Sequence, residues 1–287
     1  MTPLIPYFED PSFTIPFVGL EIHAFGILVA MGFILGGRVA QQRADQFGGS
    51  GEAVNRLIGW LVLGVFLGGH WGHLLMYKPG ELADEGQRFS TMFAMLAGGK
   101  LPHGDEWPVM LQFQHGLSSF GGFAVCVGLT IWFFRKERLP FWPNADGVAF
   151  GLTLGWFFGR MGCFSAHDHA GTPTDFYLGV YGMCPGNDRT VACHDMGLYE
   201  AIWSISVFGL FLLFGRKPRP SGFYVGMLAA LYGPYRFVSD FWRPSETDTR
   251  YAGLTPAQYG SIIVTLIAIW VLRTKVFGAK TPAATLG

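Results

Sequence analysis

Two arginines lie within stretches that are otherwise apolar enough for a lipid bilayer, Arg160 in Gly155 to Phe164 and Arg236 in Tyr232 to Phe241. A guanidinium at membrane depth costs roughly 2.5 to 3.5 kcal/mol, so each needs an anionic partner, a water-filled cavity or an anionic ligand. The planar guanidinium donates two parallel hydrogen bonds to a phosphate. The pair therefore indicates a site for a phospholipid headgroup. The alternative is that both arginines snorkel or pair with carboxylates for structure alone.

Further polar side chains accompany the two arginines near the same ends of the predicted helices. Asp240 follows Arg236 by four residues, which places both on one helix face and predicts an ion pair. At a rise of about 1.5 Å per residue, each arginine lies a turn or two below one membrane surface. The other polar residues expected at this depth are His167, Asp168, His169, His194, Tyr199, Glu200, Tyr235 and Arg243.

Histidine is the side chain that suits general-base chemistry near neutral pH. His70 and His73 are three residues apart and share one face of a predicted helix. A hydrogen-bonded pair in the core is the structural alternative for these two. His115, just before the third predicted span, is the other candidate base.

The cysteines fall into two groups. Cys126 and Cys163 lie within predicted spans, where Cys163 fits as a small packing residue, whereas Cys184 and Cys193 lie in an outer loop. In an oxidising compartment the latter two can form a disulfide. Alternatively they can bind zinc with nearby histidines, because thiolate and imidazole are its preferred ligands, although the spacing matches no standard zinc pattern. The histidines concerned are His167, His169 and His194.

These residues must be positioned by membrane-spanning helices. Half of the 287 residues are hydrophobic and only 14% are charged, against about 25% charged residues in an ordinary soluble domain. Seven apolar runs approach the about 20 residues that a spanning helix needs. They are Ile22 to Val39, Leu57 to Met76, Leu117 to Phe134, Ala145 to Phe164, Leu198 to Gly215, Gly222 to Phe241 and Thr255 to Leu272. We predict an all-α integral membrane protein with seven transmembrane helices.

Basic residues predict the orientation, because they concentrate on the cytoplasmic side. They occur in every second loop, at Arg43 and Arg56, Arg135 to Arg138, Arg216 to Arg219 and Arg273 to Lys280. The N-terminus is therefore expected on the periplasmic side and the C-terminus in the cytoplasm. The N-terminal residues lack the pattern of a cleaved signal peptide. We expect a multi-pass protein of the bacterial inner membrane, with the first span as its insertion signal.

The chain predicts a single polytopic membrane domain over residues 1–287, in which outer loops 77–114 and 165–197 form a small periplasmic cap. An amphipathic stretch from Phe89 to Leu96 predicts either a short interfacial helix or a turn packed on the bundle. Glycines three or four residues apart in the second span indicate close helix packing. They are Gly64, Gly68, Gly69 and Gly72.

From about Ile22 to Lys275 the chain resembles the bacterial prolipoprotein diacylglyceryl transferase family. The order and spacing of several motifs together carry the resemblance, as does the seven-span topology. The motifs are Ile22 to Gly26, Leu63 to His70, Gly116 to Gly122, Gly159 to Phe164 with Asp168, His194 to Glu200, and Tyr232 to Pro244.

Members of that family move the diacylglyceryl group of phosphatidylglycerol to the lipobox cysteine of a prolipoprotein, forming a thioether and releasing glycerol 1-phosphate. The resemblance implies phosphatidylglycerol, the lipobox peptide and membrane lipid as partners, with no cofactor, metal or nucleic acid. The catalytic residues that it implies are Arg160, Arg236, Asp168, Asp240 and His115, where Asp168 and Asp240 stand in place of the usual glutamates. The substrate-binding residues that it implies are Arg160, Arg236, Arg243, His23, His194, Tyr199, Glu200 and Tyr235.

The chain also departs from the family pattern. Phe120 stands where the family has the histidine of a His-Gly-Gly motif, Cys163 replaces an asparagine and His70 an arginine. Phenylalanine cannot move a proton, so His115, His70, His167 or His169 takes over, or the chain does different chemistry. The alternatives are a paralogue on the same scaffold that uses another acceptor or group, and a lipid-binding or transport protein without turnover.

Overall fold

The computed structural model describes residues 3–16, 20–112, 116, 118–184, 186, 189–244 and 250–278. The predicted base His115 lies outside these residues. The chain divides into two compact units, one of Met1–Asn55 with Pro140–Gly287 and the other of Arg56–Leu139.

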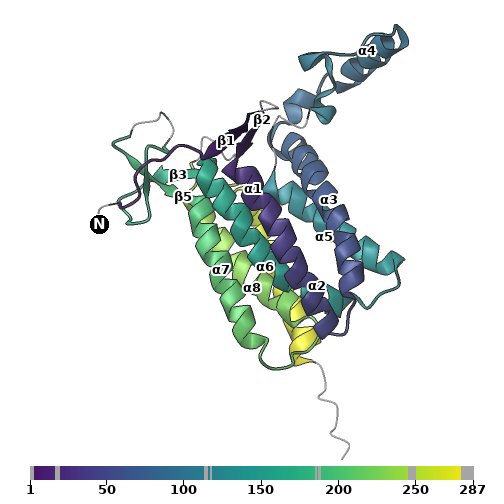
Figure 1. Cartoon of the computed structure of the whole chain (residues 1–287), viewed down its shortest axis with the longest axis vertical. Helices are drawn as coiled ribbons and strands as arrows, with labels where there is room; N and C mark the ends of the chain where they lie inside the picture. Colours follow the sequence, from purple (N-terminus) through teal and green to yellow (C-terminus); the bar gives the residue numbers. More distant parts are fainter. Residues whose placement is uncertain are drawn as a thin grey trace, which may run out of the picture. The chain divides into compact units, whose positions relative to one another are not determined.

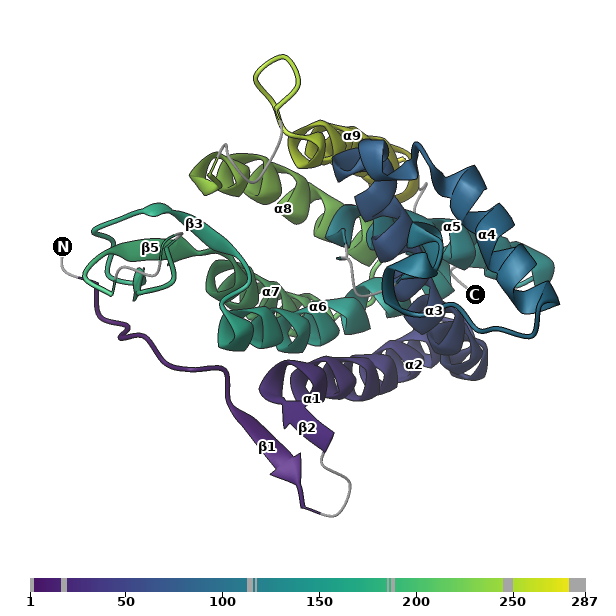
Figure 2. The same cartoon turned by 90° about the horizontal axis from the view of Figure 1, so that it is seen from above.

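Helices dominate the first unit. They are α1 (Ala24–Met31), the π-helical turn η1 (Gly32–Gly36), α2 (Gly37–Gln46), α6 (Phe141–Ala166), α7 (Met196–Phe214), α8 (Phe223–Ser239), the short η5 (Asp240–Trp242), α9 (Pro256–Val271) and the π-helical η6 (Leu272–Phe277). Figure 1 and Figure 2 show α6 beside α1, α2 and α7, and α8 beside α9. Helix α6 thus packs against α1, α2, α7 and α8, whereas α9 packs on α8.

Glycines bring α6 into direct backbone contact with the first helical segment. A Cβ added at Gly151 would lie 2.3 Å from the carbonyl oxygen of Gly36, and a Cβ at Gly36 would lie 2.8 Å from that of Gly151. Only residues without side chains allow this approach. On another side of α6, Phe150 packs with Phe211 and Tyr224 in a buried aromatic core.

The second unit is also helical. Its elements are η2 (Pro79–Leu82), α4 (Glu85–Ala97), η3 (Gly104–Glu106), η4 (Val109–Leu111) and α5 (Ser119–Lys136), and α3 (Gly51–Tyr77) continues into it from the first unit. The glycine stripe of the second predicted span packs as expected, because a Cβ at Gly72 would lie 2.5 Å from the Cα of Gly121 on α5. The amphipathic stretch is helical, within α4, and exposes Phe93 and Leu96.

His70 has a structural role within the second unit. Its ring is fully buried, and its Nε2 lies 3.0 Å from the carbonyl oxygen of Val109. The carboxylate of Glu85 accepts hydrogen bonds from the backbone amides of Val109 and Met110 at 3.0 and 2.9 Å. The core alternative therefore describes His70 better than a base that meets substrate.

Each segment in which a span was predicted contains a helix in the residues that the structure describes. Among these residues, four helices are long and apolar enough to cross a membrane by length and composition. They are Ala24–Gln46, Gly51–Met76, Met196–Phe214 and Pro256–Phe277. The protein is mostly helical, as expected of an all-α membrane protein.

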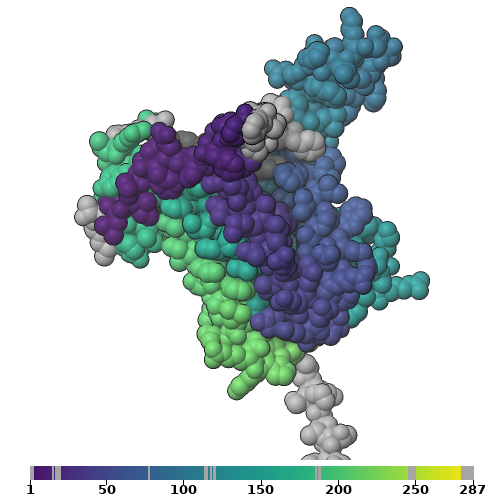
Figure 3. Space-filling view, in the orientation of Figure 1, coloured from purple at the N-terminus to yellow at the C-terminus, as the bar shows by residue number. Residues whose placement is uncertain are grey.

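The first unit also contains two small sheets that the sequence did not predict, one before α1 and one between α6 and α7. Strands β3 (Ala170–Pro173), β5 (Ala192–Asp195) and β4 (Val180–Tyr181) pair antiparallel in that order, and β1 (Ser12–Ile15) pairs with β2 (Leu20–His23). The N-terminal segment, purple in Figure 3, joins the sheet of β3, β5 and β4 through a bridge between Ile5 and Val180. Residues 165–197 thus contain a small sheet whose strand β5 is linked to Cys184 by a disulfide with Cys193.

Replacing Cys184 and Cys193 by alanine is expected to lower the free energy of unfolding by roughly 2 to 4 kcal/mol, since the bond restricts the unfolded loop. Thermal unfolding of the detergent-solubilised protein measures the change, and a reductant should reproduce it in the wild type. The matched control is Cys126→Ala, which removes a free cysteine and should leave the response to reductant unchanged. Equal melting temperatures for the double variant and the wild type would contradict the expectation.

Candidate functional site

Three helices of the first unit bring the two membrane arginines together. Arg160 lies in the last turns of α6, Arg236 in the last turn of α8, and Glu200 in the first turns of α7. All three side chains are buried. Arg160 Nε lies 2.7 Å from Glu200 Oε2, and Arg236 Nη1 lies 2.8 Å from Glu200 Oε1. One carboxylate therefore bridges the two guanidinium groups.

A second buried carboxylate extends this cluster. Asp240 Oδ1 lies 2.8 Å from Arg236 Nη2, which is the ion pair that the four-residue spacing predicts, and 3.4 Å from Arg243 Nε. The hydroxyl of Thr255 donates a hydrogen bond to Asp240 and also caps α9. We call Arg160, Arg236, Arg243, Glu200 and Asp240 the arginine network. It contains three guanidinium groups and two carboxylates.

Aromatic side chains surround the arginine network. Trp156 Nε1 donates to Glu200 Oε2 at 3.3 Å, and Trp203 stacks on Tyr235 with ring centroids 5.3 Å apart. The Tyr235 hydroxyl is buried and has no hydrogen-bond partner among the described residues. Because buried polar groups are nearly always satisfied in a working site, this hydroxyl is available to a polar ligand beside the network.

His194 and Tyr199 form a neighbouring polar contact at the start of α7. His194 Nδ1 lies 2.8 Å from the Tyr199 hydroxyl, and the imidazole stacks on Trp242, which shares η5 with Asp240. Burial lowers the pKa of His194, so its ring is neutral near neutral pH. The pair is thus suited to hydrogen bonding with a ligand rather than to carrying charge.

Within the described part of the chain Asp168 is not paired with an arginine, although the sequence placed it in the same polar group. It lies just after α6 and pairs with His169, whose Nδ1 bonds the carboxylate. Ligand atoms of Cys163, Asp168 and His169 lie within 4.8 Å of one another, which could hold a metal ion. However, Arg160 Nη1 lies 3.9 Å from Cys163 Sγ, and a fixed cation there disfavours a metal cation. The larger zinc site, in which Cys184 and Cys193 would be ligands, is excluded because these two cysteines form a disulfide with each other.

The model of one protein family, described as prolipoprotein diacylglyceryl transferase, matches residues 12–274. The chain belongs to this family. A protein of Pseudomonas syringae pv. syringae named phosphatidylglycerol–prolipoprotein diacylglyceryl transferase is 27% identical over 290 residues, covering 98% of this chain and 100% of its own length. A protein of the same name from Nitratidesulfovibrio vulgaris is 28% identical over 261 residues, covering 88% of this chain and 90% of its own length. The similarity therefore extends over nearly the whole chain.

One further residue that the resemblance to this family implied, His23, lies apart from the arginine network. His23 precedes α1 and pairs with Asp10 at 2.8 Å, and no contact with the network is described for it. His115 is outside the described residues. Two contributors were missed by sequence reasoning, Trp156 and Thr255. Trp156 precedes Arg160 by four residues, a same-face signal, and Thr255 opens a capping box with Gln258.

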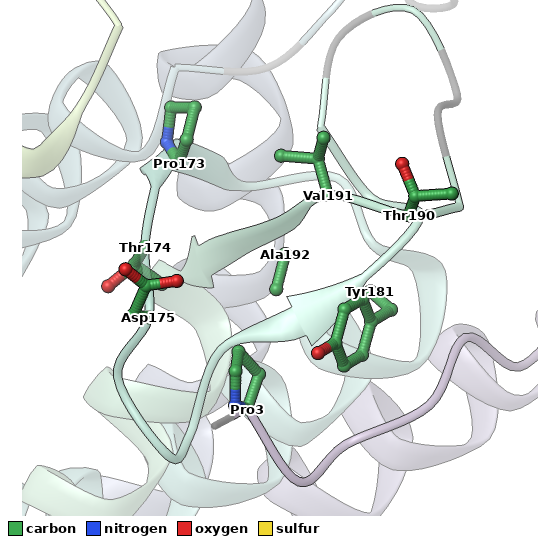
Figure 4. A pocket seen from close by; sticks show the side chains of 8 residues that line it. All are labelled: Pro3, Pro173, Thr174, Asp175, Tyr181, Thr190, Val191 and Ala192. Atoms are coloured by element: carbon green, nitrogen blue, oxygen red, sulfur yellow. The ribbon is translucent and has the colours of Figure 1, made fainter. Parts of the chain in front are cut away.

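Pro3 and residues of the segment 173–192 also line a pocket, but its lining does not suit a phosphate. The pocket has a volume of about 330 Å³. Figure 4 shows its side chains around the ends of β3, β4 and β5. The lining residues are Pro3, Pro173, Thr174, Asp175, Tyr181, Thr190, Val191 and Ala192. Asp175 is the charged residue among these eight, so the arginine network and not this pocket is the site suited to an anionic lipid.

Proposed function

We propose that this protein transfers the diacylglyceryl group of phosphatidylglycerol to the lipobox cysteine of a prolipoprotein. The observation that carries the proposal is the buried arginine network, in which Arg160 and Arg236 meet at one carboxylate on helices of a membrane protein of this family. Two guanidinium groups at this depth suit the phosphate of a membrane lipid, because each planar fork donates two parallel hydrogen bonds. The names of the relatives state the same donor and acceptor.

The reaction needs a thiolate and a stabilised leaving group. The cysteine sulfur attacks the glyceryl carbon that bears the phosphate, the carbon–oxygen bond breaks, and its electron pair stays on the phosphate oxygen. The thiol proton passes to a base, because the thiolate is the reactive form. Arg160 and Arg236 bind the phosphate and stabilise the charge that develops on it, which is where preorganised donors act most strongly.

The other residues of the proposed site divide by their contacts. Glu200 and Asp240 hold the guanidinium groups in place, and Arg243 adds a further donor to the phosphate region. The buried hydroxyl of Tyr235 donates to the bound headgroup. For His194, Tyr199 and His23 we keep the proposal of substrate binding, and for Asp168 and His115 that of a catalytic role.

We also propose seven transmembrane spans within one polytopic domain of the bacterial inner membrane, with the N-terminus periplasmic and the C-terminus cytoplasmic. The basic residues in alternate loops support this orientation. It puts Arg160 and Arg236, at the ends of α6 and α8, near the outer leaflet, where the lipobox cysteine of a secreted protein arrives. Loops 77–114 and 165–197 form the periplasmic cap in this proposal.

The test is mass spectrometry of a lipobox peptide after incubation with the purified protein and phosphatidylglycerol vesicles. The peptide should gain the mass of one diacylglyceryl group, and a peptide with serine in place of the lipobox cysteine should gain nothing. A different mass would indicate a paralogue with another transferred group, which Phe120 favours because it stands in place of the family histidine. Lipid movement without any covalent product would indicate a transporter.

A further inference from the structure

A free thiol has a pKa of about 8.5, so only a small fraction is ionised near neutral pH. Transfer at a useful rate therefore needs a base close to the phosphate site. We propose that His169, held by Asp168, is the general base that takes the proton of the attacking thiol. This inference rests on the proposed transferase function.

The backbone fixes His169 at the end of α6. His167 ends the helix with a left-handed φ of 50°, and the chain turns there into β3. The carbonyl oxygen of His169 accepts a hydrogen bond from the amide of Met196, the first residue of α7, at 3.1 Å. His169 is thus tied to the two helices that carry Arg160 and Glu200, and its place does not depend on a free loop.

Cys163 connects the His169–Asp168 pair to the arginine network. Its Sγ lies 3.9 Å from Arg160 Nη1, and it lies within 4.8 Å of the ligand atoms of both His169 and Asp168. The side chain of Cys163 is thus close both to the imidazole and to the guanidinium that binds the phosphate. A sulfur attacking the carbon beside that phosphate comes within reach of the ring.

The hydrogen bond to Asp168 selects the reactive form of the ring. An ionised carboxylate can only accept a hydrogen bond, so His169 Nδ1 carries the hydrogen. The Nε2 atom therefore keeps a lone pair for the incoming proton. The Asp168 side chain is 42% exposed and that of His169 is 22% exposed, so the pair can be reached from outside. Asp168 also stabilises the imidazolium after the proton has moved.

The charges around His169 keep the ring neutral before the reaction. Burial lowers its pKa, and the positive charges of Arg160 and Arg243 act in the same direction, whereas the bond to Asp168 opposes them. The titratable and charged groups facing it are Arg160 and Cys163 from α6, Glu200 from α7, Arg243 after η5, and Asp168 beside it. With its pKa below the usual value, His169 is deprotonated near neutral pH and ready to accept a proton.

Other described histidines are less suited to this step. His70 is buried against the carbonyl oxygen of Val109, and His167 Nε2 lies 3.0 Å from that of Phe8 while its ring packs on Phe8. His194 Nδ1 bonds the Tyr199 hydroxyl and not a carboxylate. His167 Nδ1 also lies 3.7 Å from Asp195 Oδ2, but its Nε2 is already held by the carbonyl oxygen of Phe8 and is not available to a thiol.

The step balances as one proton and one electron pair. His169 Nε2 takes the S–H proton, the sulfur forms its bond to the glyceryl carbon, and the carbon–oxygen bond breaks with its electron pair on the phosphate oxygen. The imidazolium then gives its proton to the released glycerol phosphate or to water. The ring returns to its neutral form for the next turnover.

The test compares His169→Gln with the wild type across pH, using a lipobox peptide and phosphatidylglycerol. Near neutral pH we expect kcat to fall about 10²- to 10³-fold with KM for the lipid unchanged, which is the size of a general-base contribution. The loss should shrink as pH approaches about 8.5, because the peptide thiol then ionises by itself. Added imidazole should restore part of the rate near neutral pH.

The control is His103→Gln, in an exposed part of the second unit, which should behave as the wild type. A wild-type protein that transfers nothing would contradict the proposed function. An active wild type with a His169→Gln variant of equal rate and pH profile would overturn the base assignment alone. A His169→Gln variant that is inactive at every pH would also overturn the base assignment. Wild-type activity that a chelator removes and Zn²⁺ restores would overturn it as well.

Discussion

Replacing Arg236 by alanine should lower kcat for diacylglyceryl transfer by about 10³-fold, the size found when a guanidinium that stabilises a leaving phosphate is lost. Arg236 is buried between Glu200 and Asp240, so no water replaces its charge at low cost. The variant should still fold, because Arg160 remains paired with Glu200 and Arg243 with Asp240. Initial rates of peptide lipidation measure the effect.

Two companion variants separate charge from geometry. Arg236→Lys keeps the charge but loses the planar fork, so it should recover only part of the rate. Arg216→Ala, in the exposed connection after α7, should keep the wild-type rate. A folded Arg236→Ala protein with wild-type kcat would show that this arginine is structural and does not meet the phosphate.

The Glu200→Gln substitution should lower the free energy of unfolding by about 3 to 5 kcal/mol, the usual cost of leaving buried charge unpaired. The glutamine has nearly the same shape, but it cannot neutralise Arg160 and Arg236, which lie 2.7 and 2.8 Å from the carboxylate oxygens. Thermal or denaturant unfolding in detergent measures the change. Phosphatidylglycerol should raise the stability of the variant more than that of the wild type, because the phosphate supplies negative charge.

The matched control for this carboxylate is Glu137→Gln. Glu137 pairs with Arg56 at 2.9 Å, but both side chains are more than one-third exposed. Exposed pairs contribute about 0 to 1 kcal/mol, so this variant should unfold close to the wild type. If both variants lost the same free energy of unfolding, burial of Glu200 would not increase the contribution of its charge to stability.

The sequence predicted the helices well because apolar runs of spanning length are a strong local signal. It underestimated the first of them, which continues past Val39 to Gln46, since a helix can extend into polar residues such as Gln41 and Arg43. The strands within residues 165–197 were missed. They are two to four residues long, and β3 pairs with β5 across a long loop, so no local pattern marks them.

The candidate site was predicted in its parts but not in its pairing. Arg160 and Arg236 stand out because a charge in an apolar run is visible in the sequence, and the Arg236–Asp240 pair follows from helical spacing. That Glu200 bridges both arginines could not be predicted, because it depends on which faces α6, α7 and α8 turn toward one another. For the same reason the pairing of Asp168 with His169 was not foreseen.

The central claim is that the arginine network binds the phosphate that leaves while the diacylglyceryl group moves. The most direct measurement uses phosphatidylglycerol labelled with tritium in the diacylglyceryl moiety and with radioactive phosphorus in the phosphate. After incubation with the protein and a lipobox peptide, tritium should be on the peptide and the phosphorus in water-soluble glycerol phosphate. Phosphorus on the peptide, or tritium that stays in the lipid where another family member transfers it, would contradict the account.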